Sequence, residues 1–122
     1  MSFTILCVDD NADELVLRKA MLEQHGYNVV TAIEGFEAIE LAVSKRVDAV
    51  VLDYRMGGMD GEAIAKVLKS NRPEMPVIIL SGFSVPRHVL ALVDGFAQKG
   101  DSSEAFLNQI EKLLHHSRRA AG

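Results

Sequence analysis

The sequence contains a single cysteine and no long apolar run. One cysteine cannot form an internal disulfide, so the reducing cytoplasm is the expected compartment. The longest apolar run, Val89–Val93, is far shorter than the roughly 20 residues of a membrane-spanning helix. The first ten residues, MSFTILCVDD, lack the basic start and apolar stretch of a signal peptide. We therefore expect neither secretion, nor membrane insertion, nor a disulfide-stabilised scaffold.

Basic residues are not in excess either. The chain has 13 Lys and Arg against 17 Asp and Glu, a formal net charge of −4. An acidic chain with no basic block is a poor candidate for binding nucleic acid. The rest of the composition, 48% hydrophobic over 122 residues, is that of one globular domain. We predict a single domain over residues 1–116 and a C-terminal tail over residues 117–122.

Short apolar runs alternate regularly with segments that have helical spacing. Consecutive β-branched or aliphatic residues in these runs are typical of strands covered on both faces. A β-α alternation repeated five times predicts an α/β fold, with a doubly wound parallel sheet and helices on both sides. The expected strands are Phe3–Val8, Asn28–Ala32, Asp48–Leu52, Val77–Leu80 and Gly95–Gln98.

The last helix has the clearest pattern, because Phe106, Ile110 and Leu114 share one face. Asp101 with Glu104 has the spacing of a capping box and predicts where this helix starts.

Asn11 and Glu14 have the same spacing and predict the start of the first helix. Pro86 is typical of a first helical turn, and it predicts a short fourth helix from there to about Val93.

The carboxyl ends of the expected strands carry polar residues: Asp9 and Asp10, Asp53, Ser81 and Lys99. In an open parallel sheet these positions share one crevice, where ligands bind. Three carboxylates repel one another unless a cation intervenes, and oxygen ligands without His or Cys favour Mg²⁺ over zinc or copper. A lysine and a hydroxyl beside such an ion would bind a phosphoryl group, and a carboxylate can be the nucleophile. No nucleotide-binding glycine motif is present.

Four motifs at these strand ends carry a family resemblance: ILCVDDN at residues 5–11, VVLDYRMGGMDG at 50–61, LSG at 80–82, and Lys99. In this order they resemble the receiver domain of two-component response regulators, over almost the whole chain. The resemblance implies a flavodoxin-like (βα)5 fold with a short fourth helix. It also implies a bacterial, cytoplasmic phosphoacceptor of the stand-alone type, not an enzyme, in a two-component phosphorelay.

The resemblance implies a role for each matching acid. Asp53 matches the phosphoacceptor, and Mg²⁺ is the expected cofactor. Asp10 matches the direct metal ligand, Asp9 matches its water-linked neighbour, and the backbone carbonyl of Arg55 matches a further protein ligand. The expected metal site is therefore Asp9, Asp10, Asp53 and Arg55.

Ser81 and Lys99 match the residues that bind the phosphoryl oxygens and assist the transfer. Ser81 and Phe96 match the pair that moves when the domain switches. Arg55 and Phe83 are expected to limit the access of water to the phosphoryl group and so to tune its hydrolysis. The residues flanking the site are Arg55, Met56, Gly82 and Phe83.

The resemblance also implies partners. The phosphoryl group would come from a sensor histidine kinase, a phosphotransfer protein or a small phosphodonor. A downstream protein would bind the face made by the fourth helix, fifth strand and fifth helix. We expect a monomer or weak homodimer that contacts neither nucleic acid nor a membrane.

The sequence departs from the family pattern at several points. Gly100 stands where the family usually has a proline after its lysine, so the Lys99–Gly100 peptide is expected to be trans. Lys99 follows Ser81 by only 18 positions, which shortens the fourth helix. Phe96 has no hydroxyl and cannot make the hydrogen bond of a tyrosine.

Two other functions fit parts of the sequence. A degenerate receiver would act as a phosphorylation-independent interaction module, which Gly100 and the short fourth helix favour. A small hydrolase or flavin-binding protein could share the sheet, although Arg55 stands where an Asp-dependent phosphohydrolase has a second acid. Singly, Asp9 and Asp10 fit a helix cap, Phe96 fits a core aromatic, and Cys7 fits a buried, unreactive thiol.

Overall fold

The computed structural model describes residues 2–55 and 60–121, with side chains through residue 115, and five strands alternate with five helices along them. The strands are β1 (Thr4–Val8), β2 (Asn28–Ala32), β3 (Ala49–Asp53), β4 (Val77–Ser81) and β5 (Gly95–Gln98). The helices are α1 (Ala12–Gln24), α2 (Gly35–Ser44), α3 (Gly61–Asn71), α4 (Arg87–Leu90) and α5 (Ser103–Ala121).

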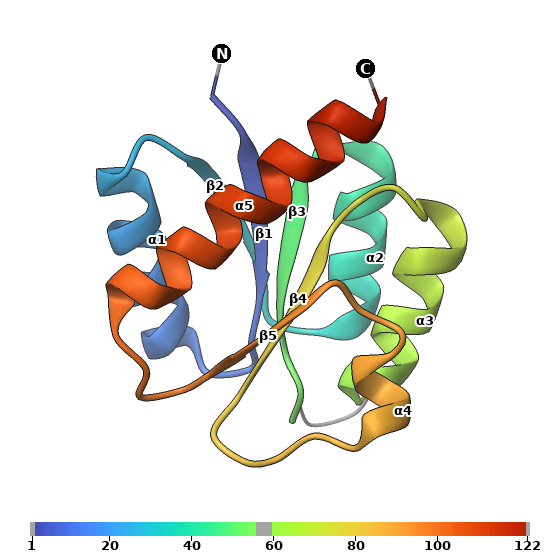
Figure 1. Cartoon of the computed structure of the whole chain (residues 1–122). Helices are drawn as coiled ribbons and strands as arrows, with labels where there is room; N and C mark the ends of the chain where they lie inside the picture. The colour runs from blue at the N-terminus through green and yellow to red at the C-terminus, as the bar shows by residue number, and fades with distance from the viewer. Residues whose placement is uncertain (1, 56–59, 122) are drawn as a thin grey trace.

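All strand pairs are parallel, and the strand order is β2-β1-β3-β4-β5. The chain moves outward from β1 to β2, returns to β3, and then continues to the other edge (Figure 1). The order therefore reverses between β1 and β3, which is where such sheets bind ligands. This confirms the predicted doubly wound, flavodoxin-like sheet.

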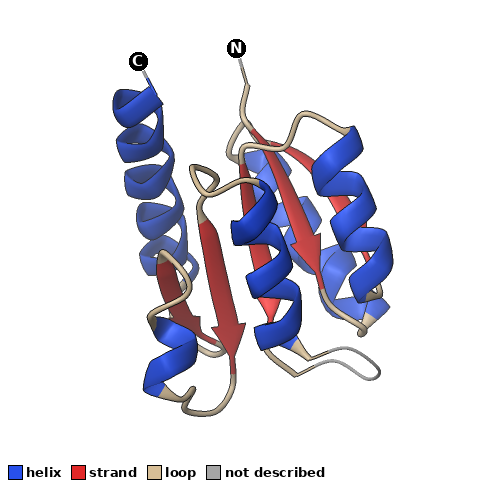
Figure 2. Ribbon diagram, turned by 90° about the vertical axis from the view of Figure 1, so that its right-hand side faces the viewer, coloured by secondary structure: helices blue, strands red, loops and turns tan. Residues whose placement is uncertain are grey.

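Helices cover both faces of the sheet, as its apolar strands require. On one face, Leu15 of α1 and Ile110 of α5 belong to a buried cluster with Ile5 and Ile78 of the sheet. The other face packs against α2 and α3, which lie in front of the strands in Figure 2. Because both faces are covered, the strand interiors are apolar throughout, which explains the continuous runs in the sequence.

The last helix follows its predicted face but begins one residue later than a cap at Asp101 would place it. Ser102, not Asp101, caps α5, because the Ser102 hydroxyl accepts a hydrogen bond from the Ala105 N–H at 3.1 Å. The Asp101 carboxylate instead accepts from the Gln98 N–H at 3.3 Å. The backbone of α5 continues to Ala121, through the segment predicted as a tail; the domain boundary at residue 116 stays a prediction.

The fourth helix is shorter than the sequence suggests, since it ends at Leu90 rather than near Val93. Turns carry the chain from there to β5. The Asp94 carboxylate accepts from the Val77 N–H at 2.9 Å and lies 2.8 Å from the Lys69 ammonium, which ties this connection to β4 and α3. Only residues 91–94 connect α4 to β5.

The strands all end at the lower edge of the sheet in Figure 1, and the two chain ends lie at the opposite edge. We call this lower edge the carboxyl edge. None of the described helices combines the length and apolar character needed to span a bilayer.

Candidate functional site

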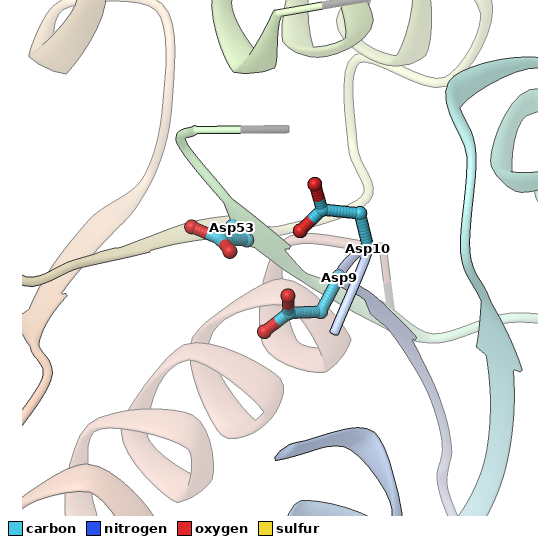
Figure 3. A group of neighbouring side chains, drawn as sticks. All are labelled: Asp9, Asp10 and Asp53. Carbon is cyan, nitrogen blue, oxygen red and sulfur yellow. The ribbon is translucent and has the colours of Figure 1, made fainter. Parts of the chain in front are cut away.

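Three carboxylates gather at the carboxyl edge. Asp9 and Asp10 directly follow β1, and Asp53 is the last residue of β3. One oxygen from each lies within 4.8 Å of the others, and Figure 3 shows the three side chains around one space. Asp9 is fully buried, Asp53 is 5% exposed, and Asp10 is exposed. The predicted convergence of acids from two separate strands is therefore observed.

The sheet itself brings these acids together. Val8 is in register with Leu52, so the residues that follow them lie side by side where β1 and β3 end. The Asp9 N–H donates to Ala32 at 3.1 Å, and Asp53 is in register with Leu80 of β4. Backbone pairing with β2 thus holds Asp9, and pairing with β4 holds Asp53.

The first turn of α1 orients Asp9. The Asn11 side chain accepts from the Glu14 N–H at 3.1 Å, which confirms the predicted cap. The Asn11 N–H donates to Asp9 Oδ1 at 2.9 Å and not to Glu14, so the reciprocal half of the capping box is absent. Arg18, one turn further on, lies 3.3 Å from Asp9 Oδ2.

Lys99 reaches the acids from the end of β5. Its Nζ atom lies 3.2 Å from Asp53 Oδ2, 3.1 Å from Glu14 Oε2 and 3.8 Å from Asp9 Oδ2. The Lys99 N–H donates to the Ser81 carbonyl at 2.8 Å, which fixes the backbone from which the side chain extends. The ammonium therefore lies among three carboxylates.

Burial and neighbouring charges shift the pKa values of Asp53 and Asp9 in opposite directions. Burial raises the pKa of Asp53 to about 6, and the neighbouring Asp9 adds to the rise, while Lys99 opposes it. Burial acts against the charged form of Asp9 too, but its hydrogen bond from Asn11, its contact with Asp53, and the charges of Lys99 and Arg18 lower its pKa. Asp53 is therefore the more readily protonated of the two.

Burial also acts against the charged form of Lys99, but the carboxylates outweigh it. The hydrogen bond with Glu14 and the charge of Asp53 raise the pKa of Lys99 above its ordinary value. Lys99 is therefore positively charged at neutral pH.

Two loops meet at the mouth of the site. The Arg55 N–H donates to Asp53 Oδ1 at 3.2 Å, and the Arg55 guanidinium lies over the Phe83 ring, 4.5 Å from its centroid. The Phe83 N–H donates in turn to the Ser81 hydroxyl at 3.1 Å. Arg55 and Phe83, predicted together as flanking residues, are thus in contact.

Gly61 closes the loop after Asp53. Its N–H donates to the Tyr54 carbonyl at 3.0 Å, and an added Cβ would lie 2.8 Å from Tyr54 Cα. Only glycine allows this approach. Met56, predicted as a flanking residue, lies outside the described residues.

The remaining predicted residues lie on β5 and directly after β4. Phe96 is half-buried and packs against the cluster of Ile79, Val85 and Val89 beneath α4. Gly82 is exposed after β4. Gly100 has a φ of +99°, which favours glycine, and the peptide between Lys99 and Gly100 is trans as predicted.

The site opens beside Lys99 into a cavity of about 310 Å³ between α1 and the connection from β5 to α5. Glu14, Leu17, Lys99 and Phe106 are among the residues that line it. The cavity therefore reaches the lysine of the site.

A family model described as the response regulator receiver domain matches residues 5–99, from β1 to the lysine at the site. The chain belongs to this family. The match covers every strand and every acid of the site, so it confirms both the resemblance and the fold expected from it.

The receiver domain also has curated relatives. It is 36% identical over 118 residues to the transcriptional regulatory protein ZraR of Salmonella typhimurium, with 93% of this chain and 27% of that protein covered. It is 33% identical over 122 residues to the response regulator MprA of Mycobacterium ulcerans, with 97% and 53% covered. The chain thus spans about a quarter to a half of the length of these relatives.

Solved structures show the same fold. A CheY-like receiver domain protein of Methanospirillum hungatei superposes with a TM-score of 0.91 at 22% identity, covering 98% of this chain and 99% of that one. The chemotaxis protein CheY4 of Vibrio cholerae superposes with a TM-score of 0.85 at 25% identity, covering 93% and 99%.

Receiver domains bind Mg²⁺ in an acidic pocket, and the residues of this chain fit that ion. Asp9, Asp10 and Asp53 offer carboxylate oxygens close enough to share one cation, and two of the three side chains are buried. Mg²⁺ prefers such hard oxygen ligands, and its charge would offset the repulsion that burial intensifies.

Glu14 and Arg18 were not predicted as site residues. They lie one turn apart on α1, and their charges contact Lys99 and Asp9 respectively. Because they are four residues apart, both lie on one face of the helix, and this spacing is visible in the sequence. Only the rotation of α1 against the sheet determines that this face meets the acids.

Proposed function

We propose that this receiver domain accepts a phosphoryl group on Asp53, with Mg²⁺ as cofactor, and that the modified domain changes its affinity for a partner protein. One observation supports the proposal above the others. Asp53, at the end of β3, shares its surroundings with two further acids and lies 3.2 Å from a lysine ammonium. A nucleophile, a cation site and a fixed positive charge are the parts that phosphoryl transfer needs.

In this proposal the acids have two roles, binding Mg²⁺ and attacking the phosphoryl group. Asp9, Asp10 and Asp53, with the Arg55 carbonyl, would hold Mg²⁺. When bound, the ion neutralises negative charge on the acids and on the phosphoryl oxygens. An ionised Asp53 oxygen attacks the phosphorus of a phosphohistidine. The phosphorus–nitrogen bond breaks, and its electron pair stays with the departing imidazole.

Lys99 and Ser81 would bind the oxygens of the new phosphoryl group. Lys99 supplies a charge that is already next to Asp53, and Ser81 supplies a hydroxyl from the neighbouring strand. Because the Ser81 hydroxyl now accepts from the Phe83 N–H, any movement of it towards the phosphoryl group disturbs that loop. Phe96 would follow Ser81, so that the surface of α4, β5 and α5 changes.

The donor in this proposal is a sensor histidine kinase or a phosphotransfer protein, and the receiver turns over no separate substrate. A protein bound at the α4–β5–α5 surface is the proposed target, and the domain acts as a monomer or weak homodimer. The cytoplasmic location expected from the single cysteine stays a prediction.

The test is phosphorylation by acetyl phosphate in the presence of Mg²⁺, followed by intact-protein mass spectrometry. The wild-type chain is expected to gain one phosphoryl group, and Asp53→Asn none. Asp60→Asn is the matched control, because it removes a nearby carboxylate while asparagine still caps α3. Equal labelling of Asp53→Asn and the control would exclude Asp53 as the acceptor.

One observation favours a second candidate, a receiver that binds its partner without phosphorylation. Helix α4 has only four residues. A switch that works by moving this helix therefore has only one short helical turn to displace. Beryllofluoride with Mg²⁺ mimics the phosphoryl group and separates the two candidates. Amide NMR shifts at Asp53, Ser81 and Phe96 are expected for the phosphoacceptor, and their absence would favour the second candidate.

A further inference from the structure

Glu14 lies in the first turn of α1, far in sequence from the lysine that it contacts. Its Oε2 atom is 3.1 Å from Lys99 Nζ, slightly closer than Asp53 Oδ2 at 3.2 Å. Both side chains are partly exposed, 40% for Glu14 and 28% for Lys99. Helix α1 therefore contributes a further acid that competes with Asp53 for Lys99.

The local structure commits the Glu14 carboxylate to this contact. In a capping box, the side chain of the acidic residue three positions after the cap accepts a hydrogen bond from the N–H of the cap residue. Here the Asn11 N–H donates to Asp9 instead, at 2.9 Å. Glu14 is anchored through its own N–H, which donates to the Asn11 side chain, while its carboxylate extends to Lys99.

The Lys99 ammonium has only three N–H donors. Two of them are used by Glu14 and Asp53, with Asp9 at 3.8 Å. A phosphoryl group on Asp53 brings three acceptor oxygens and more negative charge to this ammonium. Contacts with the phosphoryl group and with Glu14 must then be shared among the same few donors.

We propose that Glu14 is a positioning residue that restrains Lys99 and competes with the phosphoryl group for its ammonium. This inference rests on the proposed function of Asp53. While Glu14 holds part of the lysine charge, the lysine stabilises an incoming phosphoryl group less.

The test compares Glu14→Gln with Asp13→Asn. Both variants remove one carboxylate from the first turn of α1, so they share the effect on net charge and on the helix end. Phosphorylation by acetyl phosphate is expected to be about two- to fivefold faster in Glu14→Gln, the range for a partly exposed ion pair. Asp13→Asn is expected to match the wild type.

A direct readout of the lysine makes the test independent of phosphorylation. The ¹⁵N NMR signal of Lys99 Nζ, assigned by its loss in Lys99→Ala, is expected to shift in Glu14→Gln and to stay in place in Asp13→Asn. In the Lys99→Ala background, Glu14→Gln is expected to leave the phosphorylation rate unchanged, because the lysine through which it acts is gone.

The outcomes separate this inference from the proposed function. If wild type gains no phosphoryl group, the proposed function fails and the Nζ signal still decides whether Glu14 restrains Lys99. If wild type is phosphorylated but Glu14→Gln matches Asp13→Asn in rate and in Nζ signal, the inference is wrong. A rate gain that persists without Lys99 also overturns it, since Glu14 would then act by charge alone.

Discussion

The middle and the carboxyl ends of β1 and β3 are almost equally buried but differ in chemistry. Leu6 and Val50 are in register and fully buried in an apolar cluster. Asp9 and Asp53, at the ends of the same strands, are buried almost as completely. Burial of the apolar pair contributes about 25 cal/mol per Å² to folding, whereas burial of acids opposes their ionisation. The strand interiors therefore stabilise the fold, and part of that stability offsets the crowding of acids at the carboxyl edge.

The largest expected effect lies in the apolar half of this comparison. Leu6→Ala should lower the free energy of unfolding by about 2–5 kcal/mol, because the sheet is covered on both faces and cannot collapse around the cavity. Urea denaturation measures the change. Leu17→Ala is the control, since Leu17 is 72% exposed and its truncation should cost less than about 0.5 kcal/mol. Similar losses in both variants would contradict the assignment of stability to the strand interiors.

For the buried acids at the strand ends, we predict a change in the free energy of unfolding of opposite sign. Without Mg²⁺ at pH 7, Asp53→Asn should raise the free energy of unfolding by about 1–2 kcal/mol, because it removes an acid whose pKa burial raises to about 6. Mg²⁺ at ten times its dissociation constant should stabilise the wild type by about 1.4 kcal/mol and reduce the difference. Chemical denaturation with EDTA and then with Mg²⁺ measures both effects.

The same pKa sets the pH range of this effect. The folded chain holds the Asp53 proton more tightly than the unfolded chain, whose carboxyl keeps its ordinary pKa of 3.8. The unfavourable contribution is therefore absent well below about pH 4, grows as pH rises to about 6, and is constant above that. Asp60→Asn, which keeps a cap on α3, should show no such pH-dependent gain. If Asp53→Asn raised the free energy of unfolding equally at pH 4 and pH 7, the ionised Asp53 carboxylate would not be the cause of the destabilisation.

Most of the fold and the acids of the site could be predicted from the sequence for one physical reason. Buried parallel strands are marked by continuous apolar runs, and their ends are marked by the first polar residue. Asp9 and Lys99 follow β1 and β5, and Asp53 ends β3, close to where the runs place them. Parallel pairing then brings all strand ends to one edge, whatever their distance in sequence.

The contacts that the sequence could not predict depend on helix rotation and loop path. Glu14 meets Lys99 only because α1 turns that face towards the acids. Arg55 and Phe83 meet only because two loops approach each other. After the early end of α4, Asp94 bonds to β4 and α3 across the fold. No local pattern is sufficient to predict any of these contacts.

The smallest expected effect concerns the contact between those two loops, at the boundary between the buried acids and solvent. Arg55 stacks on Phe83, which is well exposed, and such an exposed contact is worth about 0.5–1 kcal/mol. If the pair limits the access of water to phosphorylated Asp53, Arg55→Ala or Phe83→Ala should speed dephosphorylation by about two- to fivefold, the rate equivalent of that energy. The decay of the phosphorylated chain after removal of the donor measures this rate.

The arginine on the opposite edge of the molecule offers the matched control. Arg46 is exposed before β3, at the amino ends of the strands, so Arg46→Ala removes the same charge without touching the site. It should leave the decay unchanged. Because Arg55 and Phe83 form one contact, the double variant should decay about as fast as either single variant rather than at the product of their effects. Multiplying effects would mean that the two side chains act separately, and that the mouth of the site is not closed by their contact.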